Sequence, residues 1–144
     1  MSGQIDKTQF AKELMKLKCK NEKGILNGYI TDQGIEQCKA ANDIIKSQYP
    51  NIKRVVLSPM RRCIQTFEHS FKDYPAWELN SLKVKFMEEM REVLMSSCDI
   101  GCWTEDEFEG IQKLDRYNFD FLDKYQDKHF WFLETLTKDV KDRA

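Results

Sequence analysis

A short apolar run followed by Ser-Pro restricts the fold of this chain more than any other feature. Residues 54–57 (Arg-Val-Val-Leu) are rich in β-branched side chains, which is typical of a buried strand. Ser58 is a residue type that caps helices, and Pro59 suits the first helical position, where a missing N–H has no cost. The sequence therefore predicts a strand followed at once by a helix over residues 59–70, an order typical of layered α/β folds.

Two arginines stand in the first turn of this predicted helix. The helix macrodipole disfavours cations there by about 0.3–1 kcal/mol each. Neither has a carboxylate one turn later, because Arg61 faces Gln65 and Arg62 faces Thr66. A phosphate would compensate both guanidinium groups and the N–H groups of the helix start. A surface helix with two solvated arginines fits the same pattern, and local chemistry alone does not decide between the two interpretations.

The neighbouring segments also alternate between helix and strand. Thr31 predicts the cap of a helix over residues 32–47, in which Gly34 would permit a close backbone approach. Residues 84–87 alternate between apolar and polar side chains and predict a second short strand. Residues 104–107 (Thr-Glu-Asp-Glu) form a capping box that begins another helix. Both strands are thus followed by charged residues at their carboxyl ends, where open α/β sheets bind ligands.

The ends of the chain give weaker patterns. Residues 4–18 carry apolar side chains at helical spacing and predict a helix. Residues 117–131 are aromatic with interleaved aspartates and predict a packing loop or lid, and residues 134–144 begin a final helix. At 144 residues, one domain over residues 1–144 is the natural count.

Composition excludes several classes of protein. The formal net charge of −1 favours neither nucleic acid nor an anionic membrane surface as a partner. No apolar stretch approaches the ~20 residues of a membrane span, and the first residues contain no apolar signal region. Five scattered cysteines make a poor disulfide framework, so we expect a cytoplasmic protein. Cys98 and Cys102 are the only close pair, so we expect no metal and no other cofactor.

Several motifs resemble those of one family. Residues 58–66 (Ser-Pro-Met-Arg-Arg-Cys-Ile-Gln-Thr) resemble the Ser-Pro-Leu-x-Arg-x-x-Gln-Thr motif of the histidine phosphatase superfamily, the phosphoglycerate-mutase-like fold. Residues 30–38 resemble its Leu-Thr-x-x-Gly-x-x-Gln-Ala, and residues 90–92 its Leu-Arg-Glu. Shorter segments are similar to the fungal and plant branch of the family, at residues 98–99, 118–121, 127–131 and 134–135. All of these matches follow the family order.

The resemblance implies a fold, a ligand and three site residues. The implied fold is a partial three-layer α/β structure, with helices flanking a small, mainly parallel sheet. The implied ligand is phosphate or a phosphorylated small molecule, bound by Arg62 with Arg61 as a weaker helper. Glu92 resembles the general acid of the family, and burial or the acids beside it would raise its pKa as that role requires. Without the resemblance, Glu92 would be a solvated acid paired with Arg91 or a lysine.

The catalytic histidines of the family have no counterpart in this sequence. The family carries its nucleophile in an Arg-His-Gly near the N-terminus and a second histidine in a late His-Gly or His-Ser. Here the two histidines are His69 and His129, and neither is followed by Gly or Ser. A divergent helical segment, residues 1–29, stands in place of the first motif, so the domain resembles an incomplete, truncated family member. Because catalytic groups act as a unit, we expect little or no phosphatase activity from the chain as written.

Three hypotheses follow from this pattern. In the first, the chain belongs to a phosphatase, which is a hydrolase, and its missing histidines lie elsewhere or on a second polypeptide. In the second, the chain is an inactive pseudoenzyme that serves as a scaffold or complex subunit. The third hypothesis is a fragment or a mis-assembled gene model. The missing strands would be central ones, so the strand at residues 54–57 would have an unpaired edge. We therefore expect a protein partner or a second copy to complete the sheet. The sequence does not specify a substrate.

Overall fold

The computed structural model describes residues 27–75, 82–91, 99, 101, 103 and 105–125. Several sequence predictions fall outside these residues: the helices at 4–18 and 134–144, most of the segment 1–29, the close cysteine pair, Glu92 and His129. Residues 27–29, the described part of the N-terminal segment, form a bend at Asn27 followed by residues without regular secondary structure.

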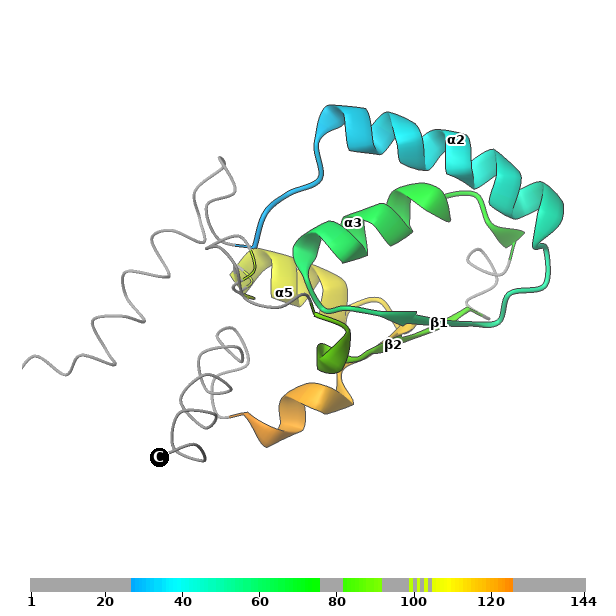
Figure 1. Cartoon of the computed structure of the whole chain (residues 1–144). Helices are drawn as coiled ribbons and strands as arrows, with labels where there is room; N and C mark the ends of the chain where they lie inside the picture. The colour runs from blue at the N-terminus through cyan, green and yellow to red at the C-terminus, as the bar shows by residue number, and fades with distance from the viewer. Residues whose placement is uncertain are drawn as a thin grey trace, which may run out of the picture.

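Within the described part of the chain, three short parallel strands form a sheet in the order β1-β2-β3. They are β1 (Arg54–Leu57), β2 (Lys83–Phe86) and β3 (Tyr117–Asn118). Because the strands are parallel, their carboxyl ends meet at one edge of the sheet. Together with the helices between them, this sheet confirms the α/β class predicted from the sequence (Figure 1).

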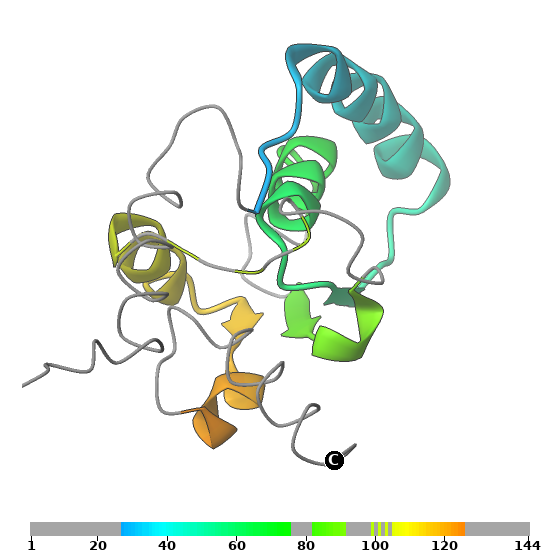
Figure 2. The same cartoon turned by 60° about the vertical axis from the view of Figure 1, so that its left-hand side comes forward.

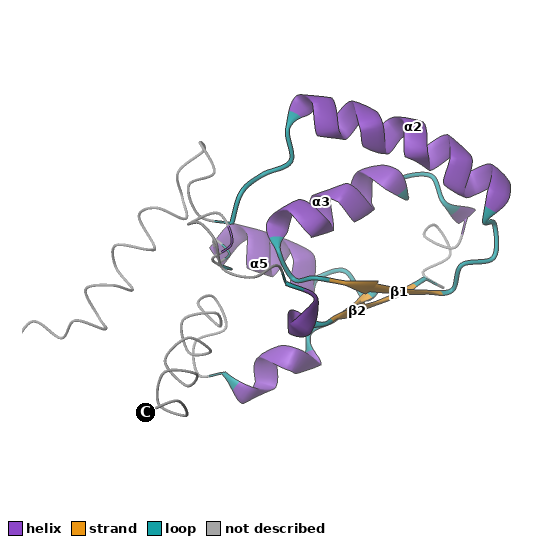
Figure 3. Cartoon of the chain, in the orientation of Figure 1, coloured by secondary structure: helices purple, strands orange, loops and turns teal. Residues whose placement is uncertain are grey.

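Two helices lie on one face of the sheet. Helix α3 (Arg61–Ser70) lies between the sheet and α2 (Asp32–Gln48), as the two views show (Figures 1 and 2). The buried side chain of Asn42 on α2 ties the two helices, since its Nδ2 donates to the carbonyl of Ser70 at 2.8 Å. The other helices among the described residues are α5 (Glu105–Gln112) and two short 3₁₀ segments, η1 (Glu88–Met90) and η3 (Asp120–Lys124) (Figure 3).

The core forms between α3 and the inner face of the sheet. Successive strand residues point to opposite faces, so β2 alternates between exposed lysines and the buried Val84 and Phe86. The ring of Phe86 stacks on that of Tyr117, with centroids 5.3 Å apart. From the helix, Ile64 and Phe67 pack into the same cluster. These apolar contacts fix α3 against the strands, and with it the residues at its amino end.

Most of the predicted elements are present, with small shifts. Helix α2 begins as predicted, because the Thr31 hydroxyl accepts from the Gly34 N–H at 3.1 Å. At Gly34 the close neighbour is a side chain rather than another backbone segment, since a Cβ there would lie 2.6 Å from Ile30 Cγ1. Strand β2 begins one residue earlier than predicted, whereas β3 falls in a segment predicted as irregular.

Two local predictions around β1 are wrong. Helix α3 begins at Arg61 rather than at residue 59, and its N-cap residue is Met60, which makes no side-chain cap. The predicted cap Ser58 instead accepts from the Met60 N–H at 3.4 Å. In addition, β1 is not buried on both faces, because Val56 is 43% exposed. An apolar run alone does not show which face of a strand is covered.

Candidate anion-binding site

The carboxyl end of β1 leads directly into the amino end of α3. Ser58, Pro59 and Met60 connect them and are all buried. The Met87 N–H donates to the Leu57 carbonyl at 2.9 Å, which holds the ends of β1 and β2 side by side. Strand ends and the first turn of a helix thus meet at one edge, the arrangement in which open α/β sheets bind ligands and helices bind anions.

Arg61 is a buried structural residue of this edge. Its side chain is 4% exposed, and its Nε and Nη2 each lie 2.6 Å from a carboxylate oxygen of Glu107 on α5. Its Nη1 donates to the Asn27 carbonyl at 2.7 Å, and its guanidinium lies over the Tyr29 ring at 4.1 Å. The Nη2 contact is a charge-assisted hydrogen bond, which is stronger than a bond between neutral groups, and the Nε contact adds to the ion pair without a hydrogen bond of its own. Arg61 therefore joins α3 to α5 and to the chain before α2.

Asn27 supplies the cap that Ser58 was predicted to give. Its Oδ1 accepts from the Arg61 N–H at 2.8 Å, across 34 residues of sequence. The residue is fully buried with φ of 47°, in the left-handed region that asparagine adopts more readily than most residues. The amino end of α3 is thus capped by a distant side chain, and the Arg61 N–H at this helix start is already bonded within the protein.

Arg62 lies in a more open position. Its side chain is 27% exposed, and its Nη2 lies 3.1 Å from Oδ1 of Asp99. The Asp99 side chain is 7% exposed, so the arginine is anchored to a buried carboxylate while part of it contacts solvent. A planar guanidinium presents N–H donors along more than one edge, so it can hold a carboxylate and bind an oxyanion together. This geometry distinguishes Arg62 from its neighbour.

Neither arginine has an acidic partner on its own helix, yet both are paired with a carboxylate from elsewhere in the chain. Their partners come from segments 46 residues away for Arg61 and 37 residues away for Arg62. Helix spacing reports only neighbours on the same helix, so Glu107 and Asp99 could not be found that way. The geometry between Arg62 and Glu92 is untested, because Glu92 lies outside the described residues.

A second charged cluster follows β2 at the same edge. The Glu88 carboxylate is buried and accepts from Lys124 and from the hydroxyl of Tyr125. Its carbonyl accepts from Arg91 Nε at 2.9 Å. The hydrogen bond to Glu88 raises the pKa of Lys124 above its ordinary value. This cluster joins η1 to η3, and only the position of Glu88 after a strand hinted at it in the sequence.

Among the described residues, we find neither a histidine beside Arg62 nor a cluster suited to a metal ion. His69 lies in the last turn of α3, about 10 Å along the helix from Arg62 at the usual rise per residue. Among the described residues there is no cluster of three or more His, Cys, Asp or Glu side chains suited to a metal ion. The helices described are all too short or too polar to cross a membrane.

Comparison with known proteins identifies the family. The model of the histidine phosphatase superfamily (branch 1) matches residues 20–144, which is most of the chain. The protein therefore belongs to the histidine phosphatase superfamily. Comparisons with curated proteins and with solved structures give no match. Members of this family bind phosphorylated substrates.

Proposed function

We propose that this protein binds phosphate or a phosphorylated small molecule at the sheet edge, with Arg62 as the main ligand. One observation carries the proposal: the Arg62 guanidinium stands in the first turn of α3, anchored by buried Asp99 and still 27% exposed. A cation in that position is unfavourable for the helix dipole and favourable for an oxyanion. Membership of a family that acts on phosphorylated substrates supports the same chemistry.

Arg61 has an indirect role in this proposal. A phosphate could reach its 4% exposed side chain only by displacing Glu107, at the cost of a buried ion pair. Its charge still adds to the positive potential at the start of α3. Its contacts with Asn27 and Glu107 hold that start in place. Arg61 thus positions Arg62, as a helper rather than a direct ligand.

Hydrolysis needs groups beyond these. In the proposal, Glu92 serves as the general acid for the leaving oxygen. A phosphohistidine intermediate also needs a nucleophilic histidine, and His69 stands at the opposite end of α3. We therefore expect phosphomonoester hydrolysis only where another segment or polypeptide supplies that histidine.

A non-catalytic role in an assembly is the second candidate. Within the described residues, β1 pairs with β2 and with no other strand, so one edge of β1 can accept a strand from a partner. A relative with this edge and without the catalytic histidines would serve as a scaffold or subunit. A monodisperse monomer with cooperative unfolding in dilute solution would contradict this candidate.

Thermal unfolding with phosphate or vanadate tests the main proposal. A ligand that binds only the folded state stabilises it, by about 2.7 kcal/mol at a concentration about 100 times Kd. We expect either anion to raise the Tm of the wild type and of Lys72→Gln, a control that removes an exposed lysine after α3, relative to chloride of equal ionic strength. Arg62→Gln should lose the shift. An unchanged shift in Arg62→Gln would contradict the proposal, as would no shift in the wild type.

A further inference from the structure

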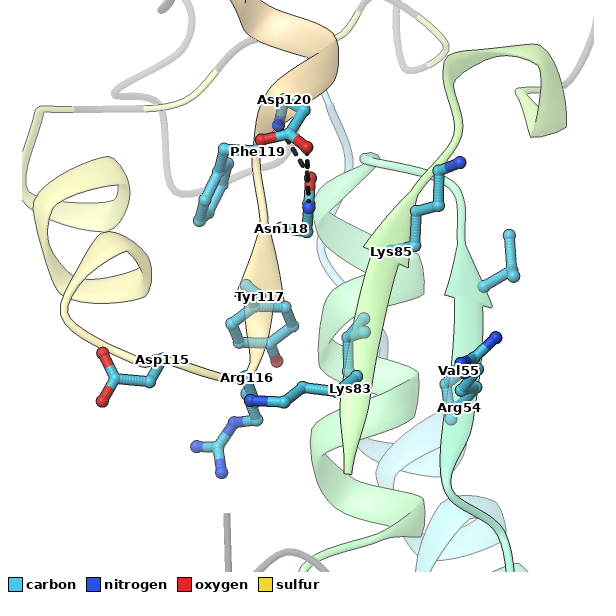
Figure 4. A pocket seen from close by; sticks show the side chains of 12 residues that line it. Arg54, Val55, Lys83, Lys85, Asp115, Arg116, Tyr117, Asn118, Phe119 and Asp120 are labelled. Atoms are coloured by element: carbon cyan, nitrogen blue, oxygen red, sulfur yellow. Dashed lines mark hydrogen bonds between the residues drawn. The ribbon is translucent and has the colours of Figure 1, made fainter. Parts of the chain in front are cut away.

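The outer face of the sheet, opposite α3, carries three cations. Arg54 of β1 and Lys83 and Lys85 of β2 are all exposed on this face (Figure 4). Within the described part of the chain, no salt bridge or side-chain hydrogen bond joins any of the three to another group. This separates them from Arg61 and Arg62, which are both held by carboxylates.

The register of the strands places two of these cations against each other. Arg54 is the partner of Lys83 in the ladder between β1 and β2. Neighbouring strands lie about 4.7–4.9 Å apart, so like charges on adjacent strands at this register repel each other. The next position on the same face pairs Lys85 with Val56, which is 43% exposed. The face therefore has two unfavourable features. Arg54 and Lys83 repel each other, which a bound anion would relieve, and the apolar side chain of Val56 is exposed to water.

The same face is hollowed. A cavity of about 660 Å³ runs over it, lined by these three cations and by Arg116 at the start of β3. Figure 4 shows the Lys83 and Arg116 side chains extending toward the same end of the hollow. Two acids also line it, Asp115 and Asp120, and the second is engaged by the Asn118 amide at 2.9 Å. Positive charge therefore predominates in the hollow.

We propose that this face docks an acidic amphipathic segment of a partner protein. Its carboxylates would lie against Arg54, Lys83 and Lys85, and one of its apolar side chains would cover Val56. Charge complementarity of this kind selects partners and speeds their association. A nucleic acid fits less well, because the aromatic side chains of the hollow, Tyr117 and Phe119, pack into the core and cannot stack on bases. This surface is separate from the Arg62 edge, and the inference does not depend on phosphate binding.

Fluorescence anisotropy with a labelled peptide of repeating Glu-Glu-Val tests the inference on the full chain. We expect the peptide to bind the wild type at low salt and to lose at least about tenfold in affinity in the Lys83→Glu/Lys85→Glu variant. Raising the salt so that the Debye length falls below about 8 Å should also weaken binding. Lys72→Glu changes an exposed lysine after α3 and should alter affinity less than about twofold.

Further arms of the experiment separate the alternatives. The Arg62→Gln variant should bind the peptide with the affinity of the wild type. A loss of affinity in this variant would assign peptide binding to the edge that carries Arg62 and would overturn the inference. Circular dichroism shows whether the double glutamate variant folds. If it does not fold, Lys83→Gln/Lys85→Gln replaces it, and we again expect a loss of peptide affinity. Equal affinity in the lysine variants, no binding to the wild type, or tighter binding of a single-stranded oligonucleotide would each contradict the inference.

Discussion

The two faces of the sheet use the same three strands for different purposes. On the inner face, Val84, Phe86 and Tyr117 are at most 7% exposed and pack against α3. On the outer face, their immediate neighbours in sequence include Lys83 and Lys85, which are exposed and without partners in the described part of the chain. A shift of one residue along a strand thus separates side chains that hold the fold from side chains that can contact another molecule.

The comparison also separates two kinds of charge. Arg61 and Glu88 are charged but buried, and each is held by several groups at the sheet edge. Removing one partner of such a set leaves the other uncompensated, so these charges matter to stability. Exposed cations on the outer face contribute little to the fold and are the ones suited to binding.

The largest effect should come from the inner face. Phe86→Ala removes a ring that is 2% exposed and leaves a cavity, so we expect a loss of about 3–5 kcal/mol in the free energy of unfolding. The matched change on the outer face, Val56→Ala, should cost less than about 0.5 kcal/mol. Urea unfolding measures both, and equal losses would break the comparison.

The buried charge at the edge should give the next largest effect. Glu107→Gln leaves the Arg61 guanidinium without its ion partner, and we expect a loss of about 1–3 kcal/mol, because the 26% exposure of Glu107 lets water compensate in part. Glu36→Gln, which breaks an exposed pair with Lys39, should cost less than about 0.5 kcal/mol. Urea unfolding again reports both, and similar losses would show that Arg61 is not a structural residue.

A smaller effect should appear as a dependence on alkaline pH. Burial, with help from the nearby Glu68 carboxylate, raises the pKa of Tyr117 above its ordinary value of 10.0, and its hydroxyl donates to Glu68 at 3.0 Å. Because the raised value belongs to the folded state, the stabilisation is fully present below pH 10.0 and is lost as pH rises through the folded pKa. Urea unfolding across this range should show a shallower decline in Tyr117→Phe, and identical slopes would contradict the burial argument.

The smallest effect should come from the outer face and should be a gain. Lys83→Gln removes the like charge beside Arg54 in the ladder, so we expect about 0.2–1 kcal/mol of added stability at low salt, the range for exposed charge pairs. The gain should fade near 1 M salt, where the Debye length is about 3 Å. Lys72→Gln is the control, and a loss of stability in Lys83→Gln would show that the lysine has a structural partner.

The sequence was sufficient where local rules decide the structure. The Thr31 hydroxyl, the β-branched run of β1 and the apolar spacing of α3 each act over a few residues, and each element is present. Strand β3 was missed because two residues carry too little pattern to be recognised. The buried role of Asn27 had no local signal beyond the Asn-Gly turn in which it stands.

The candidate site was predictable only in part. The position of Arg62 after a strand and at a helix start follows from the order of residues 54–66 alone. The carboxylates that hold the two arginines, Asp99 and Glu107, come from segments that only the tertiary fold brings near. The difference between a buried Arg61 and a partly exposed Arg62 likewise depends on contacts between distant segments. A motif thus indicated the edge of the sheet, and the fold showed which arginine is buried and which is partly exposed.

Side-chain NMR of the arginine Nε–H groups tests the central claim most directly. The two adjacent arginines can be assigned from Arg62→Lys and Arg61→Lys and followed in one titration with inorganic phosphate. We expect the Arg62 signal to shift with a saturable curve while the Arg61 signal stays in place, because Glu107 occupies that guanidinium. An Arg62 signal that does not move, or that moves only as it does with chloride of equal ionic strength, would contradict the assignment of Arg62 as the phosphate ligand.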